Sequence, residues 1–288
     1  MSGYSEQDQQ YMARAIELAS KGLYSTKPNP AVGCVLVKDG EVVGEGWHRQ
    51  AGMPHAEREA LAVAGENAAG ADAYVTLEPC SHFGRTPPCA DGLLEAGVKR
   101  VVVAMQDPNP LVAGDGIKRL QQGGVEVQVG LLEAEARKIN SGFIRRMESK
   151  LPYVRLKIAS SIDGRTAMQN GESKWITGPE SRQEVHKMRA QAGALISGIG
   201  TVLADDPSLT VRLADAELEQ MNLTQQNCHP IRVVLDPNLS MPLEAKMLSL
   251  PGRTILMTSR EAVERSAEVV ETMHAKGVEI VAVSAEDD

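Results

Sequence analysis

The sequence is poor in aromatic side chains and has no apolar run of membrane-spanning length. Phe, Tyr and Trp together make up 3% of the 288 residues, too few for the stacking surfaces on which proteins hold unpaired bases. The amino terminus, residues 1–10, is polar and lacks the apolar core of a signal peptide. We therefore expect no nucleic-acid partner and no membrane association, and we place the protein in the cytoplasm.

Positive charge and cysteine are also scarce. The formal net charge is -8, which argues against a broad surface for nucleic acid or anionic lipid. The four cysteines, Cys34, Cys80, Cys89 and Cys228, include no pair separated by two residues. The sequence thus lacks a disulfide framework and the Cys-x-x-Cys pairs common in structural zinc sites. These absences favour a protein of a reducing compartment that binds small molecules.

The length suits two domains of roughly 150 residues each. Alternating strand and helix patterns predict an α/β fold with mixed sheets covered by helices. In the first half we predict strands at 33–37, 42–43, 73–77, 100–105 and 125–129, and helices at 5–22, 55–64, 89–97 and 133–147. In the second half we predict strands at 153–159, 194–197, 231–235, 254–258 and 278–283, and helices at 179–192 and 262–275. The predicted domains are 1–148 and 149–288.

One histidine and two cysteines are candidate metal ligands. His55 opens a predicted helix, Cys80 follows a predicted strand, and Cys89 opens the next helix. One imidazole and two thiolates suit zinc, and three protein ligands leave one tetrahedral position for water. Glu57 lies near the metal without being needed as a ligand, so it is placed to act as a general base. An open metal site beside a free carboxylate indicates catalysis.

Plainer interpretations of the same residues stay open. His48 or His82 would close the site as a fourth ligand if the zinc were structural. Alternatively, the cysteines are simply buried as small hydrophobic residues, but then the His-x-Glu pattern has no explanation. Glu57, and the lack of four closely spaced ligands, favour the catalytic interpretation.

Two loops suggest ligand contacts without establishing them. Asn29, between two prolines and just before a predicted strand, is either a turn residue or a substrate contact. Gly198 and Gly200 follow a predicted strand, where glycine lets the backbone approach a phosphate. The pattern lacks the full Rossmann spacing and suits a plain turn equally well.

Taken together, both halves resemble the bifunctional deaminase-reductase family of riboflavin biosynthesis, over nearly the whole chain. The His-x-Glu and Pro-Cys patterns are those of zinc-dependent base deaminases. Residues 80–89, Cys-Ser-His-Phe-Gly-Arg-Thr-Pro-Pro-Cys, depart from the usual Cys-x-x-Cys, and with the 28–30 loop and the 198–207 segment they mark this family. The resemblance implies a cytidine-deaminase-like α/β/α domain followed by a dihydrofolate-reductase-like α/β domain that uses NADPH.

The resemblance also assigns residues. His55, Cys80 and Cys89 would hold zinc, and Glu57 would accept and donate protons. The other matching positions are Asn29, His48, His82, Arg85, Asp107 and Asn109 for the pyrimidine and phosphate pocket; Ala159, Trp175, Thr201 and Asp205 for the dinucleotide; and Ser173, Arg189, Leu209 and Arg212 for the reductase substrate. Taken without the resemblance, Leu209 suits a core position, Arg189 and Arg212 surface charges, Trp175 a packed aromatic and Asp205 a cap.

The implied activity has two steps on a pyrimidine ribose phosphate. Hydrolytic deamination of 2,5-diamino-6-(5-phosphoribosylamino)pyrimidin-4(3H)-one would precede NADPH-dependent reduction of the ribosyl group to a ribityl chain. The alternatives are a nucleoside or tRNA-base deaminase, which the acidic charge and large second domain disfavour, and a structural-zinc binding module without turnover. We also expect a homo-oligomer. Because the family continues past this length with a glycine-rich segment, we expect the reductase half to lack its C-terminal part.

Overall fold

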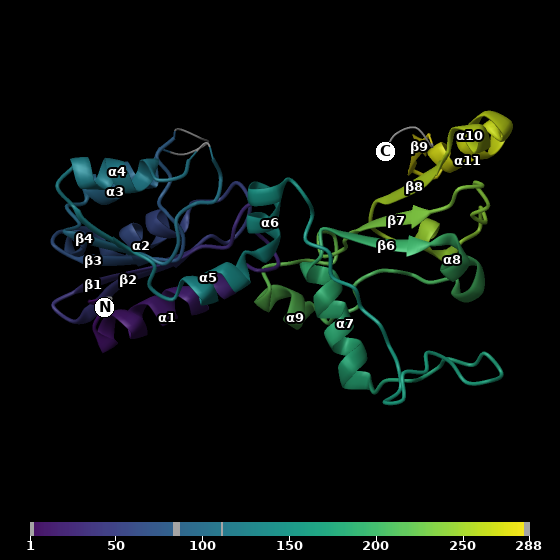
Figure 1. Cartoon of the computed structure of the whole chain (residues 1–288), viewed down its shortest axis with the longest axis horizontal. Helices are drawn as coiled ribbons and strands as arrows, with labels where there is room; N and C mark the ends of the chain where they lie inside the picture. The colour runs from purple at the N-terminus through teal and green to yellow at the C-terminus, as the bar shows by residue number, and fades with distance from the viewer. Residues whose placement is uncertain (1–2, 83–86, 111, 285–288) are drawn as a thin grey trace. The chain divides into compact units, whose positions relative to one another are not determined.

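The computed structural model describes residues 3–82, 87–110 and 112–284. The chain divides into two compact units, Met1–Leu156 and Lys157–Asp288 (Figure 1). Each unit has its own sheet, in the order β2-β1-β3-β4-β5 in the first and β6-β7-β8-β9 in the second. Both units are therefore α/β, as predicted. No helix in the described ranges is both long and apolar enough to cross a membrane.

The first unit is a mixed sheet with helices on both faces. Its elements are α1 (Glu6–Ser20), β1 (Gly33–Lys38), β2 (Glu41–Trp47), α2 (Ala56–Ala64), η1 (Gly65–Ala68), β3 (Asp72–Val75), α3 (Cys89–Glu95), β4 (Arg100–Val103), α4 (Asp115–Gln122), β5 (Glu126–Val129), α5 (Glu133–Ile139) and α6 (Ser141–Ser149). Strand β1 runs antiparallel to β2 and β3, whereas β3, β4 and β5 are parallel. The loops after β3 and β4 therefore leave the same edge of the sheet.

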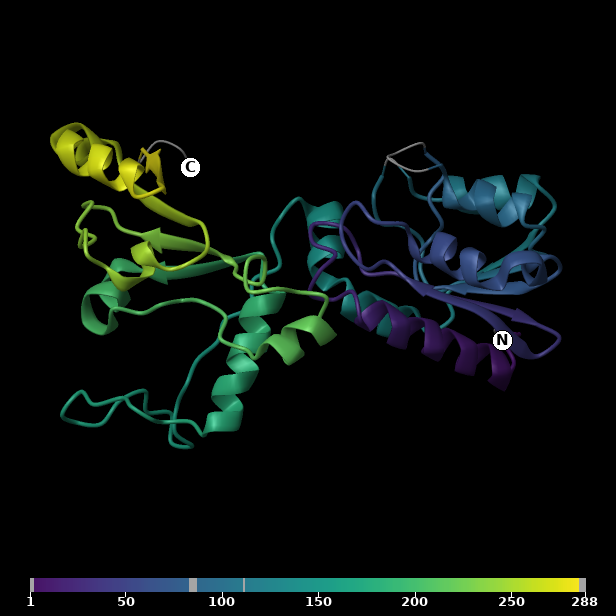
Figure 2. The same ribbon diagram turned by 180° about the vertical axis from the view of Figure 1, so that it is seen from behind.

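Two apolar clusters sandwich this sheet. Alanines of α2, Leu93 of α3 and Leu120 of α4 pack on one face, and Met12 and Leu18 of α1 pack with residues of α5 and α6 on the other. Figures 1 and 2 show α2, α3 and α4 on the side of the sheet opposite α1 and α5. The predicted strands and helices of this half match these elements within a few residues, apart from the helix predicted at 133–147.

Two glycines of β2 let α2 lie directly on the strand. A Cβ at Gly44 would come within 2.3 Å of the carbonyl oxygen of Ala60, and a Cβ at Gly46 within 2.3 Å of that of Ala56. Side chains never tolerate such distances from backbone, so only glycine fits at both positions. This close approach fixes the depth of the helix whose first turn carries Glu57.

A buried polar network ties α1 to β3 and β4. Asp8, 4% exposed, accepts a hydrogen bond of 2.7 Å from the Tyr74 hydroxyl and another from the Arg100 guanidinium. Its other oxygen accepts from the backbone and hydroxyl of Ser5, in the capping box that begins α1. Burial acts to raise the pKa of Asp8, but hydrogen bonds from Tyr74, Ser5 and Arg100 outweigh it and lower the pKa to about 2.

This network should make the first unit acid-sensitive. An aspartate has a pKa of about 3.9 in an unfolded chain, so the stabilisation from Asp8 is complete above that pH and is lost as pH falls toward about 2. Asp8→Asn should therefore lower the thermal midpoint at pH 7 and lose less stability between pH 4 and pH 2 than the wild type. Thermal unfolding of the whole chain as a function of pH measures this. Glu133→Gln, which removes an exposed pair with Arg137, should follow the wild type; parallel curves for Asp8→Asn and wild type would contradict the assignment.

The second unit is a four-stranded parallel sheet with its own core. Its elements are α7 (Pro179–Gln191), β6 (Ala194–Gly198), α8 (Ile199–Asp205), α9 (Asp215–Gln220), β7 (Ile231–Leu235), η2 (Lys246–Ser249), β8 (Thr254–Ser259), α10 (Arg260–Arg265), α11 (Ala267–Ala275) and β9 (Val278–Val283). All neighbouring strands are parallel, and Val234 and Leu256 pack with Met247 and Met273 in the core. The four strands predicted between 194 and 283 are confirmed.

The predicted strand at 153–159 is wrong. Residues 151–178 contain turns and bends but neither helix nor strand, and Figures 1 and 2 draw them as an irregular path. Val154 and Leu156 are 78% and 82% exposed. Alternating apolar and charged residues indicate how side chains would face on a sheet, but a strand forms only where a neighbouring strand pairs with it. Residues 151–178 pair with no strand among the residues that the structure describes.

Two predicted helices are broken. The helix predicted at 133–147 is two helices, α5 and α6, because Asn140 leaves the helical conformation between them. The Asn140 amide instead bonds both backbone groups of Ala31, accepting from its N–H and donating to its carbonyl oxygen, each at 2.8 Å. The helix predicted at 262–275 is likewise divided at Ser266 into α10 and α11.

Candidate active site

Three elements of the first unit each deliver one potential metal ligand to the same point. His55 is the N-cap of α2, Cys89 is the first residue of α3, and Cys80 lies in the loop after β3. Their ligand atoms all lie within 4.8 Å of one another. Nδ1 of His55 is 3.6 Å from Sγ of Cys80 and 3.4 Å from Sγ of Cys89. The structure thus brings together the three residues that the sequence singled out.

This donor set fits a tetrahedral zinc ion. Bonds of about 2.3 Å to sulfur and about 2.0 Å to nitrogen, at the tetrahedral angle, place the two ligand atoms roughly 3.5 Å apart. The sulfur–nitrogen distances of 3.4 and 3.6 Å bracket that value. Neither His48 nor His82 belongs to the group. Among the described residues the protein therefore offers three ligands, which leaves one position for water or substrate.

The two thiols differ in acidity because a hydrogen bond joins their side chains. Hydrogen bonds from Cys89 and from His55 lower the pKa of Cys80 to about 4, against the opposing effect of burial. The hydrogen bond with Cys80, together with burial, raises the pKa of Cys89. The backbone N–H of Cys89, at the start of α3, also donates to Cys80 Sγ at 3.3 Å. Thiolate is the form that binds metal, so one ligand is ready and the other gives up its proton when a cation binds.

Glu57 lies beside these ligands in the first turn of α2 and is 3% exposed. Burial, followed by the negative charge of Cys80, raises the pKa of Glu57 to about 7. A carboxyl group that takes up and releases a proton near neutral pH is suited to general acid and base catalysis. Since Glu57 is not among the three grouped ligands, its carboxylate is available for that task.

A cavity of about 530 Å³ opens beside the ligands, within the range typical of small-molecule sites. Its walls come from the loops before β1, between β2 and α2, after β3 and after β4, and from α6. The predicted substrate residues that line it are Asn29, His48, His82, Asp107 and Asn109. The remaining one, Arg85, lies outside the described residues. Loops far apart in sequence therefore meet in the one cavity that also holds His55, Glu57 and Cys80.

The cavity offers polar groups for a heterocycle rich in nitrogen and oxygen. His48 is buried, its Nδ1 lies 3.0 Å from the carbonyl oxygen of Pro54, and its Nε2 has no hydrogen-bond partner in the described part of the chain. Burial lowers the pKa of His48, which favours the neutral ring. Asp107 accepts from the backbone N–H of Asn109 at 2.8 Å, and burial raises its pKa.

Sequence reasoning missed several residues of this cavity. Phe143 of α6, Val112 and Met53 line it, and no local pattern in the sequence marks them. Glu78 lines it too. In its case a signal was present, because a glutamate directly before the Pro-Cys pair follows a predicted buried strand.

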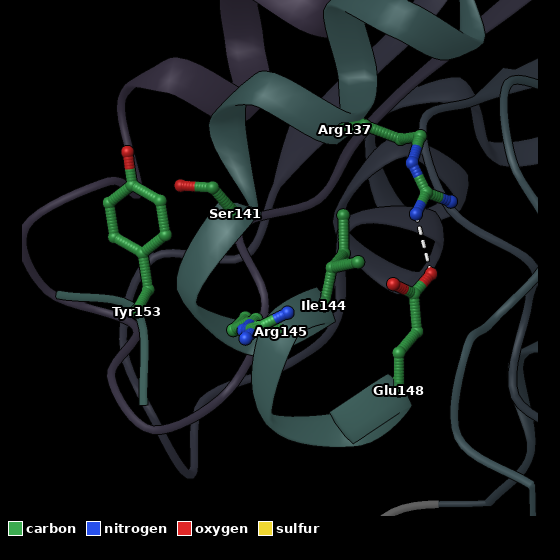
Figure 3. A pocket seen from close by; sticks show the side chains of 6 residues that line it. All are labelled: Arg137, Ser141, Ile144, Arg145, Glu148 and Tyr153. Atoms are coloured by element: carbon green, nitrogen blue, oxygen red, sulfur yellow. Dashed lines mark hydrogen bonds and ion pairs between the residues drawn. The ribbon is translucent and has the colours of Figure 1, made fainter. Parts of the chain in front are cut away.

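A second, shallower hollow of about 230 Å³ lies on α5 and α6 (Figure 3). It is lined by Arg137, Ser141, Ile144, Arg145, Glu148 and Tyr153. An ion pair between Arg137 and Glu148 spans one side of it (Figure 3). It contains none of the predicted site residues, so the candidate active site is the larger cavity.

In the second unit, two of the predicted substrate residues, Arg189 and Arg212, lie near His186. Arg189 donates from Nη1 to the carbonyl oxygen of Thr210 at 3.0 Å, and the backbone N–H of Arg212 donates to Nδ1 of His186 at 3.2 Å. Burial, with the charges of Arg189 and Arg212, lowers the pKa of His186 to about 4. Leu209 is 8% exposed and belongs to the core of this unit. The two arginines form a cationic cluster suited to an anionic ligand.

The other predicted residues of this half are spread out. Ala159, Ser173 and Trp175 lie in the irregular segment 151–178, where Trp175 is 72% exposed beneath the Arg182 guanidinium. Thr201 and Asp205 are exposed on α8. Within the part of the chain that the structure describes, no hydrogen bond or ion pair joins the predicted residues of segment 151–178 to those of α8. Their dinucleotide and substrate roles stay predictions.

The His-x-Glu at the start of α2, with Cys80 after Pro79 and Cys89 at the start of α3 beside it, is the pattern of a zinc-dependent base deaminase. The cytidine and deoxycytidylate deaminase zinc-binding region matches residues 5–105. A different family, the RibD C-terminal domain, matches residues 152–286. The two halves therefore correspond to a deaminase joined to a second, reductase domain.

The chain belongs to the RibD family of riboflavin biosynthesis proteins. It is 53% identical to the riboflavin biosynthesis protein RibD of Escherichia coli (strain K12), over 93% of this chain and 73% of that protein. It is 60% identical to RibD of Haemophilus influenzae, over 82% of this chain and 64% of that protein. The solved structure of Acinetobacter baumannii RibD, form 1, superposes with a TM-score of 0.85 at 52% identity, covering 96% of this chain and 74% of that one.

These comparisons confirm the family predicted from the sequence. They also confirm its fold, a cytidine-deaminase-like domain followed by a RibD reductase domain. The protein is a bifunctional enzyme of riboflavin biosynthesis with deaminase and oxidoreductase activity. Its cofactors are zinc in the first half and NADPH in the second.

Proposed function

We propose that this protein deaminates 2,5-diamino-6-(5-phosphoribosylamino)pyrimidin-4(3H)-one and then reduces the ribosyl group of the product to a ribityl chain. The observation that carries the proposal is the three-ligand site beside Glu57, set in a cavity of small-molecule size. A solved Thermotoga maritima structure is described as a diaminohydroxyphosphoribosylaminopyrimidine deaminase/5-amino-6-(5-phosphoribosylamino)uracil reductase. It has a TM-score of 0.79 and 39% identity to this chain, covering 95% of this chain and 80% of that one.

In the deamination, His55, Cys80 and Cys89 would hold zinc, which would supply a Lewis acid that makes water a stronger nucleophile near pH 7. Glu57 accepts a proton from the attacking water and returns it to the amine that leaves. Water first adds to the amino-bearing ring carbon, forming a carbon–oxygen bond, and the carbon–nitrogen bond then breaks, so water and the aminopyrimidine become an oxopyrimidine and ammonia. Asn29, His48, His82, Asp107 and Asn109 orient the ring in the cavity, and Arg85 contacts the phosphate.

In the reduction, NADPH supplies the hydride, and the protein's task is to orient the two molecules. We assign Arg189 and Arg212 to the phosphate-bearing substrate because they form the cationic cluster around His186. Ser173 and Leu209 complete the substrate contacts. The dinucleotide contacts are Ala159, Trp175, Thr201 and Asp205.

The domain limits of this proposal are 1–148 for the deaminase and 149–288 for the reductase. The partners are this pyrimidine ribose phosphate and further copies of the chain, in a cytoplasmic homo-oligomer that binds no nucleic acid. The acidic charge of the sequence supports the last point.

The proposal is tested by following ammonia and NADPH together. Ammonia should be released from the diaminopyrimidine phosphate without NADPH, and NADPH absorbance should fall only after deamination. Deamination of cytidine or a tRNA base, with none of the diaminopyrimidine phosphate, would instead establish a different substrate for the same site. Ammonia release with no NADPH consumption would refute the second step.

A further inference from the structure

Glu78 is a buried carboxylate whose partners are all backbone amides. It is 4% exposed and lies two residues before Cys80. Its Oε2 accepts from the N–H groups of Asp107 at 3.1 Å and Gly114 at 3.0 Å. Its Oε1 accepts from those of Gly116 at 2.9 Å and Ile117 at 3.2 Å. Four charge-assisted hydrogen bonds converge on one side chain.

This carboxylate caps α4 from a distant part of the chain. The N-cap of α4 is Gly114, which has no side chain to accept from the free N–H groups of the first turn. Glu78 accepts from three of them and places its negative charge at the positive end of the helix dipole. The beginning of α4 is thus held by a residue of the loop after β3, the loop that also carries the metal ligand Cys80.

The backbone at the start of α4 also packs closely against the segment 78–80. A Cβ at Gly116 would lie 1.9 Å from the carbonyl oxygen of Pro79, so the first turn of α4 rests against the backbone of Pro79. The group contacted is the peptide group that joins Pro79 to Cys80, so this contact is independent of the carboxylate. Together they make the segment 78–80 and the start of α4 one rigid piece.

Two cavity residues lie on the segment that Glu78 anchors. Asp107 is held through its own N–H, and the segment is held again at Gly114. Asn109 lies between these anchors, with its N–H bonded to the Asp107 carboxylate at 2.8 Å. Both Asp107 and Asn109 line the cavity. One buried side chain therefore sets the distance between the wall that contacts substrate and the loop that supplies a metal ligand.

We propose that Glu78 is a positioning residue for the deamination, holding Asp107 and Asn109 in register with Cys80. It makes no contact with the reacting atoms; it acts through the loop after β4. The proposal rests on the function proposed above, because its kinetic readout is deamination of the diaminopyrimidine phosphate. Its expected signature is weaker substrate binding with the metal still in place.

Glu78→Gln is the direct test. Glutamine keeps the size of the side chain but has one acceptor oxygen, and its amide group points N–H bonds at two of the four backbone donors. Zinc per chain should equal that of the wild type, since His55, Cys80 and Cys89 are unchanged. KM for the diaminopyrimidine phosphate should rise at least tenfold, while kcat changes less than threefold. Zinc analysis and steady-state ammonia release on the full-length chain measure these quantities.

Arg119→Gln is the matched control. Arg119 lies on α4 and forms an ion pair with Asp91 of α3. The substitution removes this pair and so weakens the packing of the same helix, away from the end that Glu78 caps. Its KM should stay within twofold of wild type. If Glu78→Gln does not fold, Glu78→Asp serves in its place, because the carboxylate is kept but drawn back by one methylene from its four donors.

A KM within twofold of wild type in the zinc-loaded Glu78 variant would overturn the proposal, and so would a loss of activity explained by lost zinc. Hydrogen exchange of the backbone amides distinguishes a failure of the positioning role from a failure of the proposed function. If the wild type itself does not turn over the diaminopyrimidine phosphate, the substrate assignment fails. Exchange at Asp107, Gly114, Gly116 and Ile117 should still rise at least tenfold in the zinc-loaded variant, and unchanged exchange would refute the positioning role.

Discussion

Glu57→Gln is expected to slow ammonia release by at least a hundredfold while the chain retains its zinc. General acid and base catalysis contributes about 10² to 10⁴ in rate, and a glutamine amide cannot accept the proton of water. The substitution is nearly isosteric at a position that is 3% exposed, so the packing of α2 should persist. Ammonia release under saturating substrate, with zinc measured per chain in the same samples, gives both quantities.

Glu59→Gln is the control for this experiment. Glu59 also lies in the first turn of α2, but its carboxylate pairs with Arg49 at 3.4 Å at the protein surface. We expect wild-type turnover from it. Ammonia release within tenfold of wild type in fully zinc-loaded Glu57→Gln would show that another group moves the proton.

Cys89→Ala is expected to abolish zinc retention and, with it, ammonia release. With two protein ligands instead of three, zinc has lost one strong thiolate bond and should dissociate on dialysis against a weak chelator. The second unit carries none of the three ligands. Reduction of a substrate that has already been deaminated should therefore continue, which would show that the second unit is still folded.

The measurements are zinc per chain after dialysis, ammonia release, and NADPH absorbance with the deaminated substrate. Cys228→Ala removes a buried cysteine of the second unit and should keep full zinc and ammonia release. Stoichiometric zinc in dialysed Cys89→Ala would mean that the metal is held by other residues.

The metal ligands and Glu57 could be predicted because each is marked by local sequence. His55 and Cys89 stand at the starts of helices and Cys80 lies in the loop after a strand, and such positions follow from short patterns of apolar residues, proline and glycine. The parallel order of β3 and β4 then places the loops that follow them at one edge of the sheet. From the sequence, those features were enough to predict where the chemistry lies.

Contacts between distant segments could not be predicted in this way. Glu78 bonds amides 29 to 39 residues away, and Asn140 bonds Ala31 across 109 residues. Neither leaves a periodic pattern, because a buried acceptor needs only free N–H groups in space. The same limit explains the wrong strand at 153–159, since strand formation depends on a partner that the segment itself does not specify.

In the second unit, the roles of single residues could not be predicted from the local sequence. No local sequence pattern marks Arg189 or Arg212. In the structure Arg189 bonds the carbonyl oxygen of Thr210, and the backbone N–H of Arg212, two residues later, bonds His186. Leu209 belongs to the core, as its residue type alone suggests. Family resemblance supplied the functional roles of these residues, whereas side-chain chemistry alone would have left them as surface and core.

The glycines of β2 make inactivating changes possible on a strand that contributes no side chain to the cavity. A methyl group at position 44 or 46 would push α2 outward, and His55 and Glu57 would move with it, away from the two sulfurs. Metal affinity and proton transfer would then fail together in a chain whose reactive residues are all intact. A random search for inactive variants should therefore recover changes in β2 that a catalogue of cavity residues would not include.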